Sequence, residues 1–106
     1  MPTQKLYGKG WRWITQDTLI NEGETLLHKL MVNASVSGGD VTLYEGLDAS
    51  SGRMIGIFTA LANSVVTLNF DGLYLDRGLF VDIGSNINGV LVVYDTLRNE
   101  NPNIEA

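Results

Sequence analysis

The chain has 106 residues, no cysteine and a net charge of −5. Its length fits one domain with a single hydrophobic core, and the lack of cysteine excludes disulfides and thiolate metal sites. No stretch is long and apolar enough for a membrane span, and residues 1–10 lack the apolar core of a signal peptide, so we expect a protein that acts without membrane insertion and without that route of secretion.

The N-terminal end differs in charge from the rest of the chain. Residues 1–13 contain three of the seven basic residues and no acidic residue, whereas all twelve acidic residues follow. We expect residues 1–10 to form an extended arm that docks onto the acidic body of a neighbouring copy or of another partner, although three cations are also ordinary for a solvated chain end. The residues expected at this subunit contact are Lys5, Tyr7, Lys9, Trp11, Arg12 and Trp13.

Short alternating segments follow the arm. Trp11 and Trp13 stand on one side of a short strand, and residues 17–21 form a second one. The segment 24–35 is long enough for an amphipathic helix. Its alternation, and the Ser-Gly-Gly turn at 37–39, favour a strand instead.

The second half of the chain alternates strand-forming segments with glycine-containing turns. Strands are expected at residues 40–45, 53–60, 64–70, 73–75, 79–83 and 90–94. Gly56, inside one of these strands, indicates a bulge or a close backbone approach. About eight short strands at regular spacing predict an all-β, antiparallel β-sandwich with a jelly-roll-like arrangement. We expect this single domain to span residues 11–96, with residues 97–106 as a polar tail.

The same alternation predicts which side chains face the core. Positions that recur every second residue between turns belong to one face of a strand. The residues expected in or next to the core are Val66, Leu68, Phe70, Leu79, Val81, Ile83, Val90, Val92 and Tyr94.

The polar residues form no catalytic pattern. His28 is the only histidine, so a metal centre built from several imidazoles is excluded, and a Ser-His-Asp triad would depend on this one residue. The aspartates lie at or near turns, where they serve local hydrogen bonds. Calcium would have to use loop 48–52 or loop 71–76, neither of which has the EF-hand pattern. We therefore expect no enzymatic activity, no catalytic residue, no cofactor and no metal site.

The tryptophan pair has two interpretations. Aromatic platforms on β-sandwiches stack against sugars, which makes carbohydrate an alternative partner. Aromatic residues are also favoured at protein interfaces, and Trp11 and Trp13 lie beside the arm rather than on several strands. We favour packing of this pair against the sandwich or a neighbouring subunit. Duplex nucleic acid does not suit the acidic body of the chain.

Three segments of the second half carry a family resemblance. They are Gly-Gly-Asp-Val-Thr-Leu-Tyr-Glu-Gly at 38–46, Gly-Arg-Met-Ile-Gly-Ile-Phe at 52–58, and LNFDGLYLDRGLFVDI with NGVLVVYD within 68–95. Together they resemble a type of small β-sandwich protein encoded by tailed bacteriophages. In that type a V-T-L-Y-(D/E)-G strand precedes a glycine-rich loop and a closing G-L-(F/Y)-V-D…V-V-Y pair. The shared residues are strand and turn residues, so the resemblance carries no site residues over.

The resemblance implies a non-enzymatic virion structural protein. The most specific expectation is a capsid decoration (cement) protein that stabilises the particle through subunit contacts. Its partners would be copies of itself and other virion proteins, above all the major capsid protein. Its location would be the virion, assembled in the host cytoplasm. A head–tail or tail adaptor is the alternative within this class, and a carbohydrate-binding or receptor-recognition module is the alternative outside it.

Overall fold

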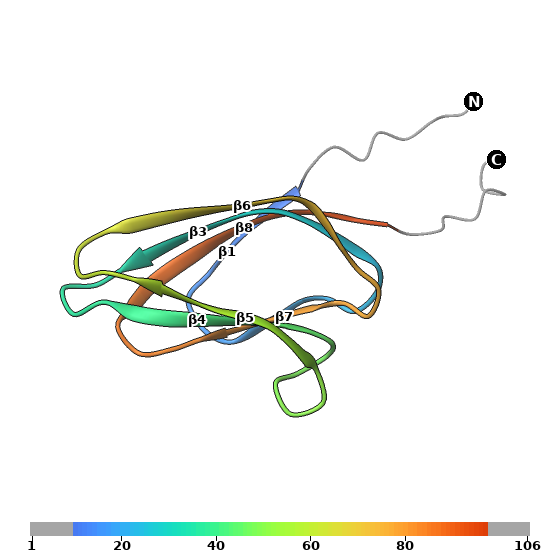
Figure 1. Ribbon diagram of the computed structural model, residues 1–106, viewed down its shortest axis with the longest axis horizontal. Coiled ribbons are helices and arrows are strands. Elements are labelled where there is room, and N and C mark those ends of the chain that lie inside the picture. The colour runs from blue at the N-terminus through green and yellow to red at the C-terminus, as the bar shows by residue number, and fades with distance from the viewer. Residues whose placement is uncertain (1–9, 98–106) are drawn as a thin grey trace, which may run out of the picture.

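The computed structural model describes residues 10–97, which form eight strands and no helix (Figure 1). The strands are β1 (Gly10–Ile14), β2 (Thr18–Asn21), β3 (Thr25–Ala34), β4 (Gly39–Glu45), β5 (Arg53–Ala60), β6 (Val65–Leu75), β7 (Leu79–Ile83) and β8 (Ile87–Thr96). β1 begins at Gly10, the last residue assigned to the expected arm.

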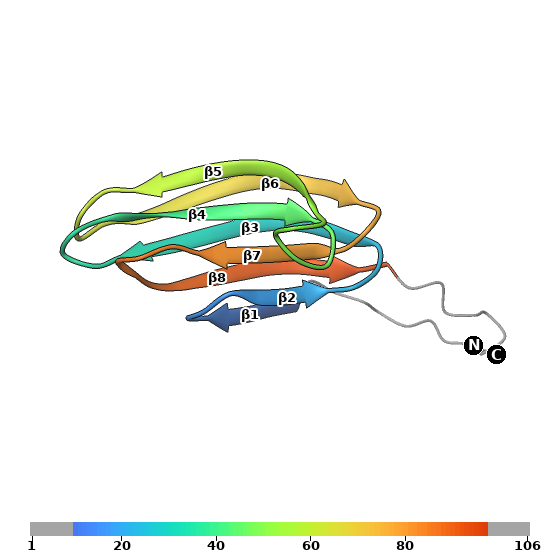
Figure 2. The ribbon, with the colours of Figure 1, turned by 90° about the horizontal axis from the view of Figure 1, so that it is seen from below.

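The strands form two four-stranded sheets with the order β1-β8-β3-β6 in sheet A and β2-β7-β4-β5 in sheet B. All neighbouring strands are antiparallel. The chain changes sheet at every connection except the β4–β5 hairpin. The two sheets form two layers (Figure 1), and their strands run along the long axis of the molecule (Figure 2). This wrapped order is that of a jelly roll, and the expected jelly-roll-like antiparallel sandwich is confirmed.

The core lies between the sheets and follows the predicted alternation. Of the nine expected core residues, Leu79, Val81, Val90 and Val92 are fully buried. The other five are partly buried and pack against the buried cluster: Val66, Leu68, Phe70, Ile83 and Tyr94. Each strand therefore turns one side chain in two toward the opposite sheet, as a sandwich requires.

The ambiguous segment 24–35 is a strand, as favoured. It becomes β3, which lies in the middle of sheet A between β8 and β6. Its fully buried side chains are Thr25, Leu27, Leu30 and Val32. The inward-facing positions of β3 are odd-numbered up to Leu27 and even-numbered from Leu30. They change because the register with both neighbouring strands shifts between Leu27 and Lys29, where His28 is the extra residue of a bulge.

One expected boundary is wrong. Residues 64–70 and 73–75 were predicted as two strands with an Asp-Gly turn between them, whereas the structure has a single strand, β6. Asp71 and Gly72 both have positive φ, 54° and 78°, and they bulge out of the ladder opposite His28. Pairing with β3 resumes on both sides of the bulge, so the chain does not turn back.

The structure adds two details to the expected strands, a bulge in β5 and an earlier start of β8. The register between β4 and β5 passes from Leu43 opposite Gly56 to Tyr44 opposite Met54, which confirms the bulge expected in β5. β8 begins at Ile87, before the expected 90–94, because its ladder with β3 continues that far.

Candidate functional site

β1 is an edge strand that presents two indoles on an ordered sheet. It pairs with β8 along its whole length, with Trp11 opposite Val93 and Trp13 opposite Leu91. Ile14 is buried in the core, whereas Trp11 is 68% exposed and Trp13 is 49% exposed. The tryptophans therefore share the outward side of sheet A, and the edge strand holds both of them in register.

Apolar side chains continue from the tryptophans across sheet A. Residues that pair directly across strands share a face, and Leu91 of β8 pairs with both Trp13 of β1 and Met31 of β3. Two residues further along β8, Val93 pairs with Trp11 of β1 and with Lys29 of β3, whose side chain also points outward. We call the outward surface formed by Trp11, Trp13, Met31, Leu91 and Val93, with Lys29 at its border, face A.

The indole of Trp13 packs against Gly89 of β8. A Cβ placed on Gly89 of β8 would fall inside the ring of Trp13, so the indole lies directly over the backbone at this position. A shallow hollow beside it is lined by Gly10, Trp11, Leu91 and Val93. Face A is therefore a shaped apolar surface in which both backbone and side chains take part.

Face A becomes polar toward the far edge of sheet A. Lys29 pairs with Asn69, and Met31 pairs with Thr67 on β6. An apolar centre with a polar border is the usual layout of a protein interface.

His28 and Asp95 form a pair at one end of the outward side of sheet A. His28 Nε2 and Asp95 Oδ2 are 2.9 Å apart, and both side chains are largely buried. Within the described residues the imidazole hydrogen-bonds only to Asp95, and Asp95 Oδ1 is buried without a partner. No serine joins this pair and no cluster of three His, Cys, Asp or Glu side chains exists among residues 10–97.

The six residues expected at the subunit contact divide into three groups. Trp11 and Trp13 lie together on face A. Arg12 points to the other side of β1, where Nη1 donates a long 3.5 Å hydrogen bond to the carbonyl oxygen of Leu19 in sheet B, so it links the two sheet edges. Lys5, Tyr7 and Lys9 lie outside the described residues.

Two of the three loop carboxylates that calcium would need, Asp48 and Asp76, accept hydrogen bonds from the chain itself. Asp48 Oδ1 accepts hydrogen bonds from the Ser51 hydroxyl, the Ser51 N–H and the Ser50 hydroxyl at 2.7–3.0 Å. The bonds from Ser51 lower the pKa of Asp48. Asp76 Oδ1 accepts a 3.2 Å hydrogen bond from the Tyr74 hydroxyl. These contacts are local turn hydrogen bonds.

Among the described residues, Glu45 is the carboxylate whose side chain is classed as buried. Its oxygens accept hydrogen bonds from the N–H of Asp76 at 2.7 Å, from the N–H of Arg77 at 3.3 Å and from Arg53 Nη2 at 2.8 Å. Burial opposes its ionisation, but the bonds from Arg53 and the two backbone groups outweigh this and lower the pKa of Glu45. Glu45 thus anchors the β6–β7 turn to β4.

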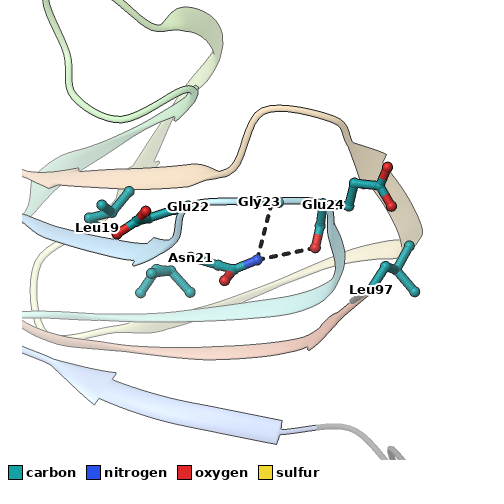
Figure 3. Close-up of a pocket in the computed structure, with 7 residues that line it drawn as sticks. Leu19, Asn21, Glu22, Gly23, Glu24 and Leu97 are labelled. Carbon is teal, nitrogen blue, oxygen red and sulfur yellow. Dashed lines mark hydrogen bonds between the residues drawn. The ribbon is translucent and has the colours of Figure 1, made fainter. Parts of the chain in front are cut away.

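The residues that line a cleft at the β2–β3 turn hold the turn together (Figure 3). Asn21 Nδ2 donates hydrogen bonds to the carbonyl oxygens of Gly23 and Glu24 at 3.1 Å and to Thr25 Oγ1 at 2.8 Å. This amide therefore holds the turn. Among the described residues that line it, the ionisable groups are Glu22 and Glu24, and two carboxylates by themselves make no catalytic set.

Comparisons with protein-family models, with curated proteins and with solved structures found no match. The resemblance of residues 38–95 to phage virion proteins therefore stays a hypothesis from the sequence. In the part of the chain that the structure describes, no helix could cross a bilayer.

Sequence reasoning missed the outward apolar residues of β8 and β3. A signal for them exists, because every residue from Val90 to Tyr94 is apolar or aromatic. A strand that is apolar on both sides is covered on both sides. No comparable signal exists for the His28–Asp95 pair, whose members are 67 positions apart.

Proposed function

We propose that this chain is a non-enzymatic structural protein that works as a subunit of a larger protein assembly and is held in it through face A. The observation that carries the proposal is the exposure of Trp11 and Trp13 on an ordered, continuous apolar surface. Apolar surfaces of this kind mark interaction sites, and tryptophan is among the residues that contribute most to binding at interfaces.

The energetic incentive to cover face A is large. Trp11 and Trp13 are 68% and 49% exposed, so covering both indoles would remove on the order of 200–300 Å² from water, worth about 5–7 kcal/mol before the costs of association. A matching partner surface would therefore bind strongly.

The most specific form of the proposal is a capsid decoration protein of a tailed bacteriophage. The sequence resemblance over residues 38–95 supports this form. A head–tail or tail adaptor is the alternative within the same class. The test is quantitative mass spectrometry of purified particles of a phage that encodes the chain. A copy number that matches the capsid lattice supports decoration, one that matches a single ring supports an adaptor, and absence from the particle contradicts both.

The role of face A has its own test. The variant Trp11→Ser/Trp13→Ser should bind about tenfold or more weakly to particles that lack the protein, because it loses the central aromatic contacts. Co-sedimentation with the particles measures this. The matched control is Val36→Ser/Leu61→Ser, which removes two side chains exposed by 74% and 73% in turns away from face A. Equal binding by both variants would show that face A is not the contact.

Carbohydrate binding is the second candidate, because the exposed indoles share the outward side of sheet A with the amides of Asn33 and Asn69. Aromatic rings beside hydrogen-bonding groups suit sugars. Titration with soluble oligosaccharides, followed by tryptophan fluorescence, separates the two functions. Saturable quenching that Trp11→Ser/Trp13→Ser abolishes would favour the sugar.

A further inference from the structure

A second apolar surface lies on the opposite side of the sandwich. Phe80 of β7 pairs with Leu19 on one side and Tyr44 on the other, and Tyr44 pairs with Met54 of β5. The rings of Tyr44 and Phe80 are 6.4 Å apart. These residues alternate with buried ones, so they point outward from sheet B. With Ile57, they form a surface that we call face B: Leu19, Tyr44, Met54, Ile57 and Phe80.

Face B is exposed toward its β5 edge. Met54 is 52% exposed and Ile57 is 56% exposed. Two large aliphatic side chains at an edge strand are a liability unless something covers them. The molecule therefore carries one apolar surface on each outer side of its sandwich, facing in opposite directions (Figure 1).

The two faces differ in charge. Face B is bordered by Asp82 and Asp40, which alternate with buried residues on β7 and β4 and point outward. Asp17 lies beside Asp82, and burial together with this neighbouring carboxylate raises the pKa of Asp82. The outward positions of the described strands of sheet B contain no lysine or arginine.

Face A has the opposite character. Lys29 borders it. On the same side of sheet A, Asp95 is paired with His28, and the exposed Asp71 lies in the β6 bulge, opposite His28 rather than beside Lys29. Among the described residues, face A is therefore apolar with a lysine at its border, and face B is apolar with carboxylates at its border.

Charge decides which contact between copies is favoured. Two A faces in contact would bring Lys29 toward its own counterpart, and two B faces would bring carboxylates together. Only contact between unlike faces joins apolar surface to apolar surface with opposite charges at the border.

We propose that face A of one copy packs on face B of a second copy. This inference rests on the proposed function, because it names the neighbour that covers face A. Since the two faces lie on opposite sides of one molecule, the contact is head-to-tail. It produces a closed ring if the rotation between copies closes and a row of copies if it does not.

The test uses two variants that each block one face. Trp11→Ser/Trp13→Ser blocks face A, and Met54→Ser/Ile57→Ser blocks face B. All four side chains are about half exposed or more, so both variants should keep the far-UV circular dichroism of the parent. The mass of each protein, alone and in an equimolar mixture, is measured by sedimentation equilibrium at low salt.

The expected pattern is specific to a head-to-tail contact. The parent protein should form species larger than a dimer, and each variant alone should be monomeric. The mixture should form a dimer and nothing larger, because the intact face B of one variant meets the intact face A of the other. The control Val36→Ser/Leu61→Ser should behave like the parent.

Three results would overturn the inference. They are a monomeric parent, self-association of either blocked variant, which indicates contact between like faces, and a mixture that stays monomeric. If a blocked variant does not fold, Lys29→Glu replaces it and should weaken parent association about tenfold or more; unchanged association would contradict the proposal. A parent protein that is present in particles but monomeric when purified would contradict this inference and leave the proposed function standing. A protein that assembles with itself but is absent from particles would contradict only the virion form of the proposed function.

Discussion

Gly89 determines where the indole of Trp13 lies, and with it the shape of face A. The backbone of Gly89 has no positive φ, so Gly89→Ala strains no turn. Its new methyl group would nevertheless occupy the place of the Trp13 ring. We expect a folded protein whose Trp13 swings into solvent, with red-shifted tryptophan emission and several-fold weaker association.

The matched control for this change is Gly10→Ala on the neighbouring strand. There the added Cβ would meet only the carbonyl oxygen of Tyr94 at 3.5 Å, an ordinary contact. Its emission spectrum should equal that of the parent. A parent-like spectrum for Gly89→Ala would mean that Trp13 does not rest on Gly89.

The ionisation of Glu45 makes the free energy of unfolding depend on pH. Its pKa in the folded chain is lowered from the ordinary value of 4.5, so the stabilisation by the ionised carboxylate is fully present above that value. It is lost as the pH falls through the lowered folded-state pKa. Glu45→Gln should lower the free energy of unfolding at neutral pH by about 1–3 kcal/mol, because an amide cannot replace a carboxylate that accepts three hydrogen bonds.

Urea unfolding at neutral pH and below about pH 4 measures both effects. The difference between parent and Glu45→Gln should shrink in acid. Arg53→Gln is the control, because the Arg53 side chain is 83% exposed and surface ion pairs contribute less than about 1 kcal/mol. Equal losses in the two variants would show that the backbone bonds to Glu45 contribute little.

At the scale of elements, two glycines with positive φ, Gly72 and Gly78, allow the cost of backbone strain to be compared with the cost of a steric clash. Gly72 sits in the β6 bulge with φ 78°, and an added Cβ would touch only the His28 ring at about 3.9 Å. Gly78 sits in the β6–β7 turn with φ 101°, and its Cβ would lie 2.5 Å from the carbonyl oxygen of Asn21. Alanine in a left-handed conformation costs about 1–2 kcal/mol.

Gly72→Ala should therefore lose about that amount of unfolding free energy, and Gly78→Ala should lose clearly more, because the turn must also move away from β2. Chemical denaturation of both variants under the same conditions provides the comparison. A larger loss for Gly72→Ala would indicate that the bulge in β6, rather than the turn, is the tightly packed element.

At the scale of the whole molecule, the uneven charge predicts the effect of removing the N-terminal residues. Deletion of residues 1–9 removes Lys5 and Lys9 and leaves β1 in place. We expect an unchanged far-UV spectrum and weaker self-association at low salt, because less positive charge opposes the carboxylates of face B.

Sedimentation velocity at low and high salt checks this prediction. The difference between the truncated and full-length proteins should disappear at high salt, where exposed charges are screened. If the truncated protein associates as well as the full chain at low salt, the basic residues of this segment take no part in the contact.

Local patterns in the sequence determined the fold class and the inward faces of the strands. Val90 and Val92, or Leu79 and Val81, could be assigned to the core because side chains alternate along a strand regardless of its partner. The tryptophans could be placed on one side of their strand for the same reason. Asp71-Gly72 was misread because two residues that favour positive φ serve a turn and a bulge equally well.

Only the tertiary structure decided which strands lie side by side. The register that joins Trp13 to Leu91 and then to Met31, and the bonds from Glu45 to a turn 31 positions away, depend on pairing between distant segments. So do face A and face B, because each needs three or more strands in a particular order. Local propensity acts over a few neighbouring residues, whereas a surface is composed by the packing of the whole chain.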